Sequence, residues 1–150
     1  MRRKDRETSA ARAYEILDKC QYGILSVCDG GIPYGVPVSF GREGDTIYIH
    51  TAVEGKKNEI FEKNQNVSFC CVTDTHIIEE KFTTKFASVI VTGKICEVFD
   101  EEEIRKAFNV ICEKLTPSNM AGVEDEILKA KNRYKIYAID IKEVTGKQNL

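Results

Sequence analysis

The segment from Tyr34 to Lys57, YGVPVSFGREGDTIYIHTAVEGKK, decides how this chain folds. It predicts a strand, a glycine-rich turn, a second strand and a loop that ends where a helix begins. Pro37 lies inside the first strand and has no N–H to donate to a neighbouring strand. We therefore expect this strand to lie at a sheet edge, or to present its backbone to a ligand.

The helix start at the end of this segment carries Gly55, Lys56 and Lys57. The first turn of a helix has unpaired N–H groups and the positive end of the helix dipole, so it suits an anion, and the lysines add positive charge. The segment therefore predicts a site for a flat, phosphorylated molecule, with its ring along the strand and its phosphate at the lysines. The alternative is an ordinary charged helix face with ion pairs along it. The charged neighbours of the two lysines are Glu54, Glu59, Glu62 and Lys63.

The composition is that of an ordinary globular protein, with 42% hydrophobic and 31% charged residues and a net charge of −2 over 150 residues. We expect a single domain over residues 1–150, large enough to bury a core. The acidic balance and the lack of a basic, aromatic strand face argue against nucleic-acid binding. The opening MRRKDRETSA lacks the apolar core of a signal peptide, and no apolar run approaches a membrane span, so we expect a cytoplasmic protein.

The cysteines form no CxxC pair and lie within apolar patterns. We expect them to be small buried hydrophobic residues in a reducing compartment. The two histidines, His50 and His76, stand in no ligand spacing with them, so no metal site is predicted. The six cysteines are Cys20, Cys28, Cys70, Cys71, Cys96 and Cys112.

Strand patterns recur along the chain, with few and mostly short helices between them. The predicted strands span residues 22–28, 32–40, 46–51, 67–73, 86–99 and 134–144. Four helices are predicted. The first begins after Thr8 or Ser9, and the other three span residues 55–64, 100–115 and 124–132. Residues 41–45 are expected to form a turn, 74–85 a polar loop and 145–148 a tail.

These elements indicate a mostly β or α+β fold, a small six-stranded antiparallel barrel, closed or partly open, with short flanking helices. Tight turns between the first three strands predict an antiparallel meander. Gly93 predicts a bulge in its strand, and the apolar run 67–73 predicts burial on both faces. A barrel this small leaves apolar strand surface for a partner, expected at Val89, Val91 and Ile95.

The order of these segments resembles the pyridoxamine 5′-phosphate oxidase-like FMN-binding split barrels, and among them the nitroimidazole-resistance (Nim) subgroup. The matching segments cover nearly the whole chain: MRRKDRE, PYGVPVSFG, YIHTAVEGKK, NQNVSFCCV, ASVIVTGKICEV and DIKEVTGKQ. The resemblance implies a split barrel that forms a homodimer, with two FMN sites at the subunit interface. The sequence lacks the arginine- and histidine-bearing C-terminal segment with which the true oxidases hold pyridoxal phosphate, so oxidation of vitamin B6 is not expected.

The resemblance also implies which residues contact the cofactor. The flavin ring would lie along the strand with Val36, Pro37, Val38, Ser39 and Phe40, and the ring and ribityl chain would be flanked by Ile49, His50, Thr51 and Ala52. The phosphate would meet Lys56 and Lys57 beside Gly55. Ser88, next to Val89, would lie near the cofactor, and Lys147 and Gln148 would approach the partner subunit's flavin.

Two functions follow from these expectations. The first is reduction of small molecules such as nitroaromatics by bound FMN, which a nicotinamide nucleotide reduces. The second is a non-catalytic module that binds or senses flavin or haem, because the same phosphate site would serve it. His50 is the candidate catalytic donor since its unperturbed pKa lies near physiological pH, and a structural histidine in a strand is the alternative.

Overall fold

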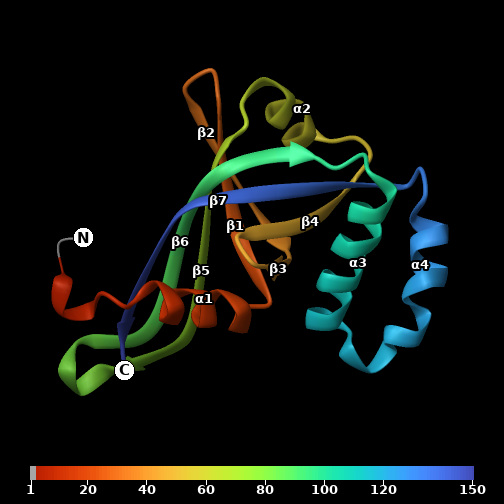
Figure 1. The fold of residues 1–150 in the computed structure, drawn as a ribbon. Helices are drawn as coiled ribbons and strands as arrows, with labels where there is room; N and C mark the ends of the chain where they lie inside the picture. The colour runs from red at the N-terminus through yellow and green to blue at the C-terminus, as the bar shows by residue number, and fades with distance from the viewer. Residues whose placement is uncertain (1–2) are drawn as a thin grey trace.

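Residues 3–150, which the computed structural model describes, form one seven-stranded antiparallel sheet, four α-helices and three short 3-10 helices (Figure 1). The strands are β1 (Tyr22–Asp29), β2 (Ile32–Ser39), β3 (Gly41–Glu43), β4 (Thr46–Ala52), β5 (Asn66–Ile78), β6 (Thr83–Glu97) and β7 (Tyr134–Asn149). The helices are η1 (Lys4–Arg6), α1 (Ala10–Lys19), α2 (Lys56–Lys63), η2 (Glu79–Lys81), α3 (Glu101–Leu115), η3 (Pro117–Gly122) and α4 (Val123–Ala130). The predicted fold class, an antiparallel split barrel with flanking helices, is confirmed, with one strand more than expected.

The two edges of the sheet are neighbours in the sequence. The strand order is β2-β1-β5-β6-β7-β4-β3, so β2 and β3 form opposite edges, and Phe40 alone separates them in the chain. Two residue steps span at most about 7 Å, so the sheet has to curl until its edges lie close together. Phe40 has no exposed surface, and its ring packs edge-on against Phe69 with the centroids 4.8 Å apart. The prediction that Pro37 lies in an edge strand is confirmed.

The predicted meander is wrong beyond its first hairpin. β1 and β2 pair across Gly30 and Gly31, but β4 pairs with β3 and β7 and not with β2. Part of the predicted turn over 41–45 is the strand β3. A Cβ on Gly41 would lie 2.8 Å from backbone atoms of α3, so this glycine lets α3 pack directly on β3.

Two predicted loops are also strands. Residues 74–85, expected to be a polar loop, mostly continue β5 and β6 as a hairpin in which His76 lies opposite Lys85. Residues 145–148, expected to be a tail, belong to β7 and pair with the start of β6. Their polar side chains are typical of loops, but both stretches are paired through backbone hydrogen bonds. The bulge predicted at Gly93 is confirmed by a register shift between Thr92 and Gly93.

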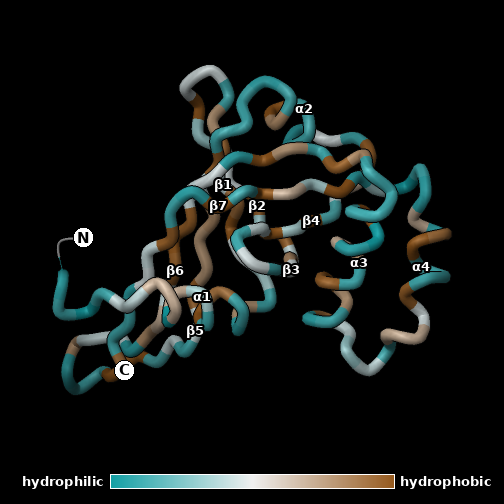
Figure 2. The backbone as a smooth tube through the Cα atoms, in the orientation of Figure 1, coloured by the Kyte–Doolittle hydropathy of each residue, from teal (hydrophilic) through white to brown (hydrophobic). Residues whose placement is uncertain are grey.

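Strand residues alternate between a barrel interior and an outer face. The interior cluster joins inward residues of the strands with residues of α1 and α2, among them Ile16, Leu17, Leu25, Ile49, Ile60, Phe61, Phe69, Val91 and Ile139. A second cluster lies between the outer face of β4 and β7 and the helix pair α3–α4. Figure 2 shows hydrophobic stretches along the strands, whereas α2 and the loop before it are mostly hydrophilic.

Three burial predictions need correction. Val89, Val91 and Ile95 point into the barrel and are buried, so they offer no surface to a partner. The 67–73 strand is buried on its inner face only, because its outward residue Val72 is 57% exposed. Among the cysteines, Cys20 and Cys71 are buried as expected, whereas Cys96 is exposed.

None of the helices formed by residues 3–150 combines the length and hydropathy needed to cross a membrane.

Lys114 of α3 lies beside Phe40, the residue that connects the two edge strands. Lys114 Nζ lies 3.3 Å from the centroid of the Phe40 ring and 3.5 Å from the carbonyl oxygen of Leu17 near the end of α1. Burial disfavours the charged ammonium and lowers the pKa of Lys114 from 10.5 to about 8, although Cys71 and Asp18 act in the opposite direction. This amine therefore couples the stability of the fold to pH.

We expect the wild-type chain to gain stability relative to Lys114→Met as the pH rises from 8 toward 10.5. In this window the unfolded lysine still holds a proton that the folded lysine has lost, so the free energy of unfolding increases with pH. Denaturant unfolding of both proteins at about pH 7.5 and about pH 9.5 measures the difference. A gap between the two proteins that stays constant with pH would contradict this expectation.

Candidate functional site

The loop between β4 and α2 brings the predicted phosphate residues together. β4 ends at Ala52 and α2 begins at Lys56, directly after Gly55. Gly55 has a φ of +147°, which favours glycine, and its carbonyl oxygen accepts the N–H groups of Asn58 and Glu59 at 3.0 and 3.3 Å. No loop or cap hydrogen bond within residues 3–150 uses the N–H groups of Lys56 and Lys57, which leaves them free at the helix start.

Asn58 fixes this loop from inside the molecule. The side chain is 3% exposed, and Nδ2 donates to the carbonyl oxygens of Ala52 at 2.8 Å and Val53 at 3.1 Å. The Ala52 carbonyl oxygen also accepts the hydroxyl of the buried Thr51 at 2.9 Å. Asn58 Oδ1 is buried without a hydrogen-bond partner among the described residues. Leaving a buried acceptor without a hydrogen bond costs about 1–3 kcal/mol of stability. The two hydrogen bonds that Nδ2 donates to the loop therefore hold the amide in this orientation.

The two lysines take different positions. Lys56 Nζ lies 4.9 Å from the centroid of the Tyr34 ring, a cation–π contact that connects the start of α2 to β2. Lys57 lies near enough to His50 to affect its titration. None of the ion pairs within residues 3–150 involves either lysine, so the charged-face alternative finds no support here.

His50 stands on β4 beside this helix start. Its ring packs edge-on against the ring of Tyr134, with centroids 5.6 Å apart. Desolvation first, and then the positive charge of Lys57, lower the pKa of His50 below its ordinary 6.5. The imidazole is therefore neutral at physiological pH, and one of its ring nitrogens can donate a hydrogen bond.

The remaining predicted ring contacts divide by exposure. Pro37 and Ser39 are exposed on the outer face of β2, whereas Val36 and Val38 are half-buried and pack against the interior cluster. Phe40 and Ile49 have no exposed surface. Their side chains belong to the core, so only their backbone could face a ligand on the surface of this chain.

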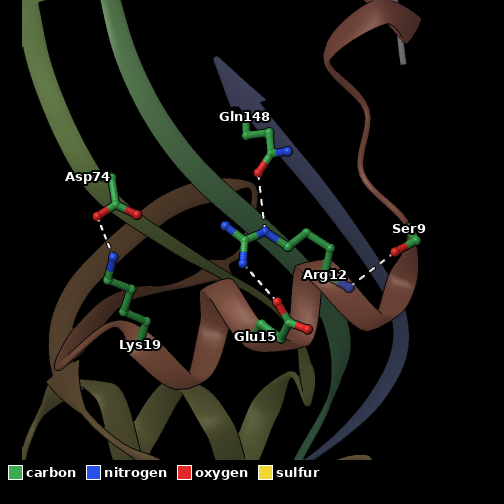
Figure 3. A network of polar contacts seen from close by, with 6 residues as sticks. All are labelled: Ser9, Arg12, Glu15, Lys19, Asp74 and Gln148. Carbon is green, nitrogen blue, oxygen red and sulfur yellow. Dashed lines mark hydrogen bonds and ion pairs between the residues drawn. The ribbon is translucent and has the colours of Figure 1, made fainter. Parts of the chain in front are cut away.

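Ser88, Lys147 and Gln148 form a second group. Ser88 lies opposite Lys147 in the pairing of β6 with β7, and its hydroxyl donates to the Lys147 carbonyl oxygen at 3.4 Å. Gln148 Oε1 accepts a hydrogen bond from Arg12 Nε at 3.2 Å, which ties the end of β7 to α1 (Figure 3).

β7 connects the two groups and shows how far apart they are. His50 pairs with Ile136 near the start of β7, and Ser88 pairs with Lys147 near its end. The eleven residue steps between Ile136 and Lys147 correspond to about 36 Å of strand. Figure 1 places α2 and the C-terminus at opposite ends of the molecule. One chain therefore does not bring the two groups to one small ligand.

Three residues at the start of α2 and around His50 are not apparent from the sequence. Tyr34 and Tyr134 contact Lys56 and His50 from β2 and β7, and Asn58 holds the loop. The one local signal for Asn58 is that an amide side chain lies in the first turn of a helix. Tyr34 and Tyr134 are distant in sequence from the residues they contact, so no local pattern indicates them. Within residues 3–150, no group of three or more histidine, cysteine or acidic side chains could hold a metal ion.

Comparison with known proteins identifies the family. The family profile described as pyridoxamine 5′-phosphate oxidase matches residues 9–148. The chain belongs to this family. The match spans both groups of candidate site residues, and the resemblance read from the sequence is confirmed. A search of curated proteins gives no match.

Solved structures agree with membership of the pyridoxamine 5′-phosphate oxidase family. A proposed 5-nitroimidazole antibiotic resistance protein from Bacteroides thetaiotaomicron is 25% identical, with a TM-score of 0.76 over 93% of this chain and 83% of that one. An FAD-binding protein from Mesorhizobium loti is 21% identical, with a TM-score of 0.68 over 97% of this chain and 98% of that one. The flavocytochrome Anf3 from Azotobacter vinelandii is 20% identical, with a TM-score of 0.76 over 95% of this chain and 68% of that one. The last two show the fold alone.

We expect Lys57→Met to raise the pKa of His50, because the variant removes a positive charge that disfavours the imidazolium. Lys56→Met serves as the matched control, since Lys56 lies against Tyr34 instead. Titration of the His50 ring protons by NMR measures both variants. Equal shifts in the two variants, or none in Lys57→Met, would show that Lys57 does not set the protonation of His50.

Proposed function

We propose that this member of the pyridoxamine 5′-phosphate oxidase family is a cytoplasmic homodimer that binds FMN and reduces small molecules such as nitroaromatics with electrons from NADH or NADPH. The observation that carries the proposal is the start of α2. There, two lysines and backbone N–H groups that form no ion pair or hydrogen bond within the described part of the chain lie next to the edge strand β2.

The groups at the start of α2 fit a phosphate ester. The helix dipole, the free N–H groups of its first turn and two ammonium groups that form no ion pair with residues 3–150 all favour an anion. The outer face of β2 presents Pro37 and Ser39, whose small side chains leave room for a flat ring. A phosphorylated aromatic cofactor therefore matches both parts of the site.

When bound, the flavin would supply the electron transfer between the nicotinamide nucleotide and the acceptor. The chain would bind and orient it. Lys56 and Lys57 would neutralise the phosphate, and β2 would support the ring. His50, neutral at physiological pH, would donate a hydrogen bond from a ring nitrogen to an acceptor atom of the flavin or of the substrate.

Two observations support a homodimer. The two groups of site residues lie at opposite ends of one chain, so a flavin in contact with both needs two chains. In addition, the outward positions of β1, β5 and β6 carry no charged side chain over the central rows, although 31% of the chain is charged. These positions are Tyr22, Ile24, Ser26, Ser68, Cys70, Val72, Ser88, Ile90 and Thr92. An interface that uses the same face on both copies has two-fold symmetry.

A non-catalytic module that binds or senses flavin or haem is the second candidate. It is favoured by the similarity in fold to a flavocytochrome and to an FAD and heme binding protein from Mycobacterium smegmatis. Rapid mixing of the flavin-loaded protein with NADH or NADPH distinguishes the two. Faster reduction than that of free FMN supports the enzyme, and an equal or slower rate supports the module. Purified protein that takes up neither FMN nor FAD would overturn both flavin proposals.

We expect Lys56→Met/Lys57→Met to weaken FMN binding by about tenfold or more while riboflavin binding changes little, because riboflavin has no phosphate. Lys63→Met, in the last turn of the same helix, is the control and should bind both molecules like the wild type. Quenching of flavin fluorescence on titration measures the affinities. Equal losses for FMN and riboflavin would place the phosphate elsewhere.

We expect Ile90→Glu to convert the dimer to a monomer at micromolar concentration, because it places a charge on each side of a desolvated two-fold interface. Ile90 is 48% exposed at the centre of the uncharged face. Leu128→Glu, on the exposed side of α4, is the control. Sedimentation velocity measures the oligomeric state, and a wild-type monomer with flavin fully bound would refute an interface site.

A further inference from the structure

We infer that Asn58 is the positioning residue of the phosphate site, because it turns the N–H groups of Val53 and Glu54 outward beside those of Lys56 and Lys57. The four groups would together bind the phosphate of a flavin nucleotide. This inference rests on the proposed function and assigns a role to a residue that does not itself touch the ligand.

The orientation of the two peptide groups follows from the hydrogen bonds of Asn58. Its Nδ2 binds the carbonyl oxygens of Ala52 and Val53 from inside the molecule. Both peptide bonds are trans, so each N–H points opposite to the carbonyl of the same peptide group. The Ala52 carbonyl shares its peptide group with the N–H of Val53, and the Val53 carbonyl with that of Glu54. Both N–H groups therefore point away from Asn58, toward the surface.

These two N–H groups are free to bind a ligand. No hydrogen bond formed within residues 3–150 uses the N–H of Val53 or Glu54, and both residues are exposed. The positive φ of Gly55 then turns the chain into α2, where the first-turn N–H groups are also free. Successive free N–H groups of a loop and a helix start are the kind of donors that form anion-binding concavities.

The orientation of the Asn58 amide is itself determined. A reversed amide would place Oδ1 against two carbonyl oxygens, and acceptors do not bind one another. The observed orientation leaves Oδ1 buried and unpaired, so the contacts of Nδ2 with the loop decide it. Local burial alone would not require a donor at this position.

The test compares Asn58→Leu with Asn64→Leu in the full-length protein, with FMN and riboflavin as probes. Leucine keeps the approximate shape of asparagine but cannot donate. Asn64 is the matched control because its Nδ2 binds the Cys28 carbonyl oxygen at 3.1 Å from the opposite end of α2. We expect the preference for FMN over riboflavin to fall by about tenfold in Asn58→Leu and to stay unchanged in Asn64→Leu.

The outcomes separate this inference from the proposed function. A wild-type protein without any preference for FMN over riboflavin would overturn the proposed phosphate site. A wild-type preference that Asn58→Leu retains, or that both variants lose equally, would overturn the role of Asn58 alone.

A second measurement needs no variant. In the 15N-labelled wild-type protein, the amide signals of Val53 and Glu54 should shift with FMN and not with riboflavin, together with those of Lys56 and Lys57. If the lysine amides shift with FMN and the other two do not, the loop does not bind the phosphate and the inference fails.

Discussion

A single residue, Phe40, joins the two edge strands of the sheet, and this short connection constrains the rest of the molecule. β2 and β3 cannot separate by more than two residue steps, so the seven-stranded sheet has to curl on itself. The curl creates an interior, and apolar side chains of α1 and α2 pack into it. The buried ring of Phe40, between Phe69 and Lys114, holds the two edges together without hydrogen bonds between them.

The candidate site depends on the unpaired edge of β2. Because β2 is left unpaired on one side, its backbone and its outer residues stay accessible next to α2. Three features define the helix start: lysines that form no ion pair within residues 3–150, a loop held by Asn58, and a histidine whose pKa is lowered by partial desolvation and by Lys57. Together they produce a local excess of hydrogen-bond donors and positive charge on a chain whose net charge is −2.

Charge is distributed unevenly over the surface. The helix pair α3–α4 begins each helix with acidic residues and forms ion pairs such as Arg105 with Glu124. The outward rows of β1, β5 and β6 carry apolar and small polar side chains instead, including the exposed Ile24 and Ile90. A surface of this kind carries no charged group that would have to be desolvated when another molecule covers it.

The sequence by itself determined the features that depend on neighbouring residues. A tight turn predicted the first hairpin, Pro37 predicted an edge strand, Gly93 predicted a bulge, and the pattern over residues 100–115 predicted the helix α3. The start of α2 at Gly55, Lys56 and Lys57 could be predicted for the same reason, because the ends of helices depend on neighbouring residues.

Only the tertiary structure decided the features that depend on distant pairing. It placed β4 beside β7, made strands of polar stretches such as 145–148, and turned Val89 inward and Ile90 outward. It also separated Ser88 and Lys147 from His50 and revealed Asn58 as the support of the loop. Local propensity contains no information on which strand closes a sheet; that is settled by the long-range packing of the whole core around one short connection.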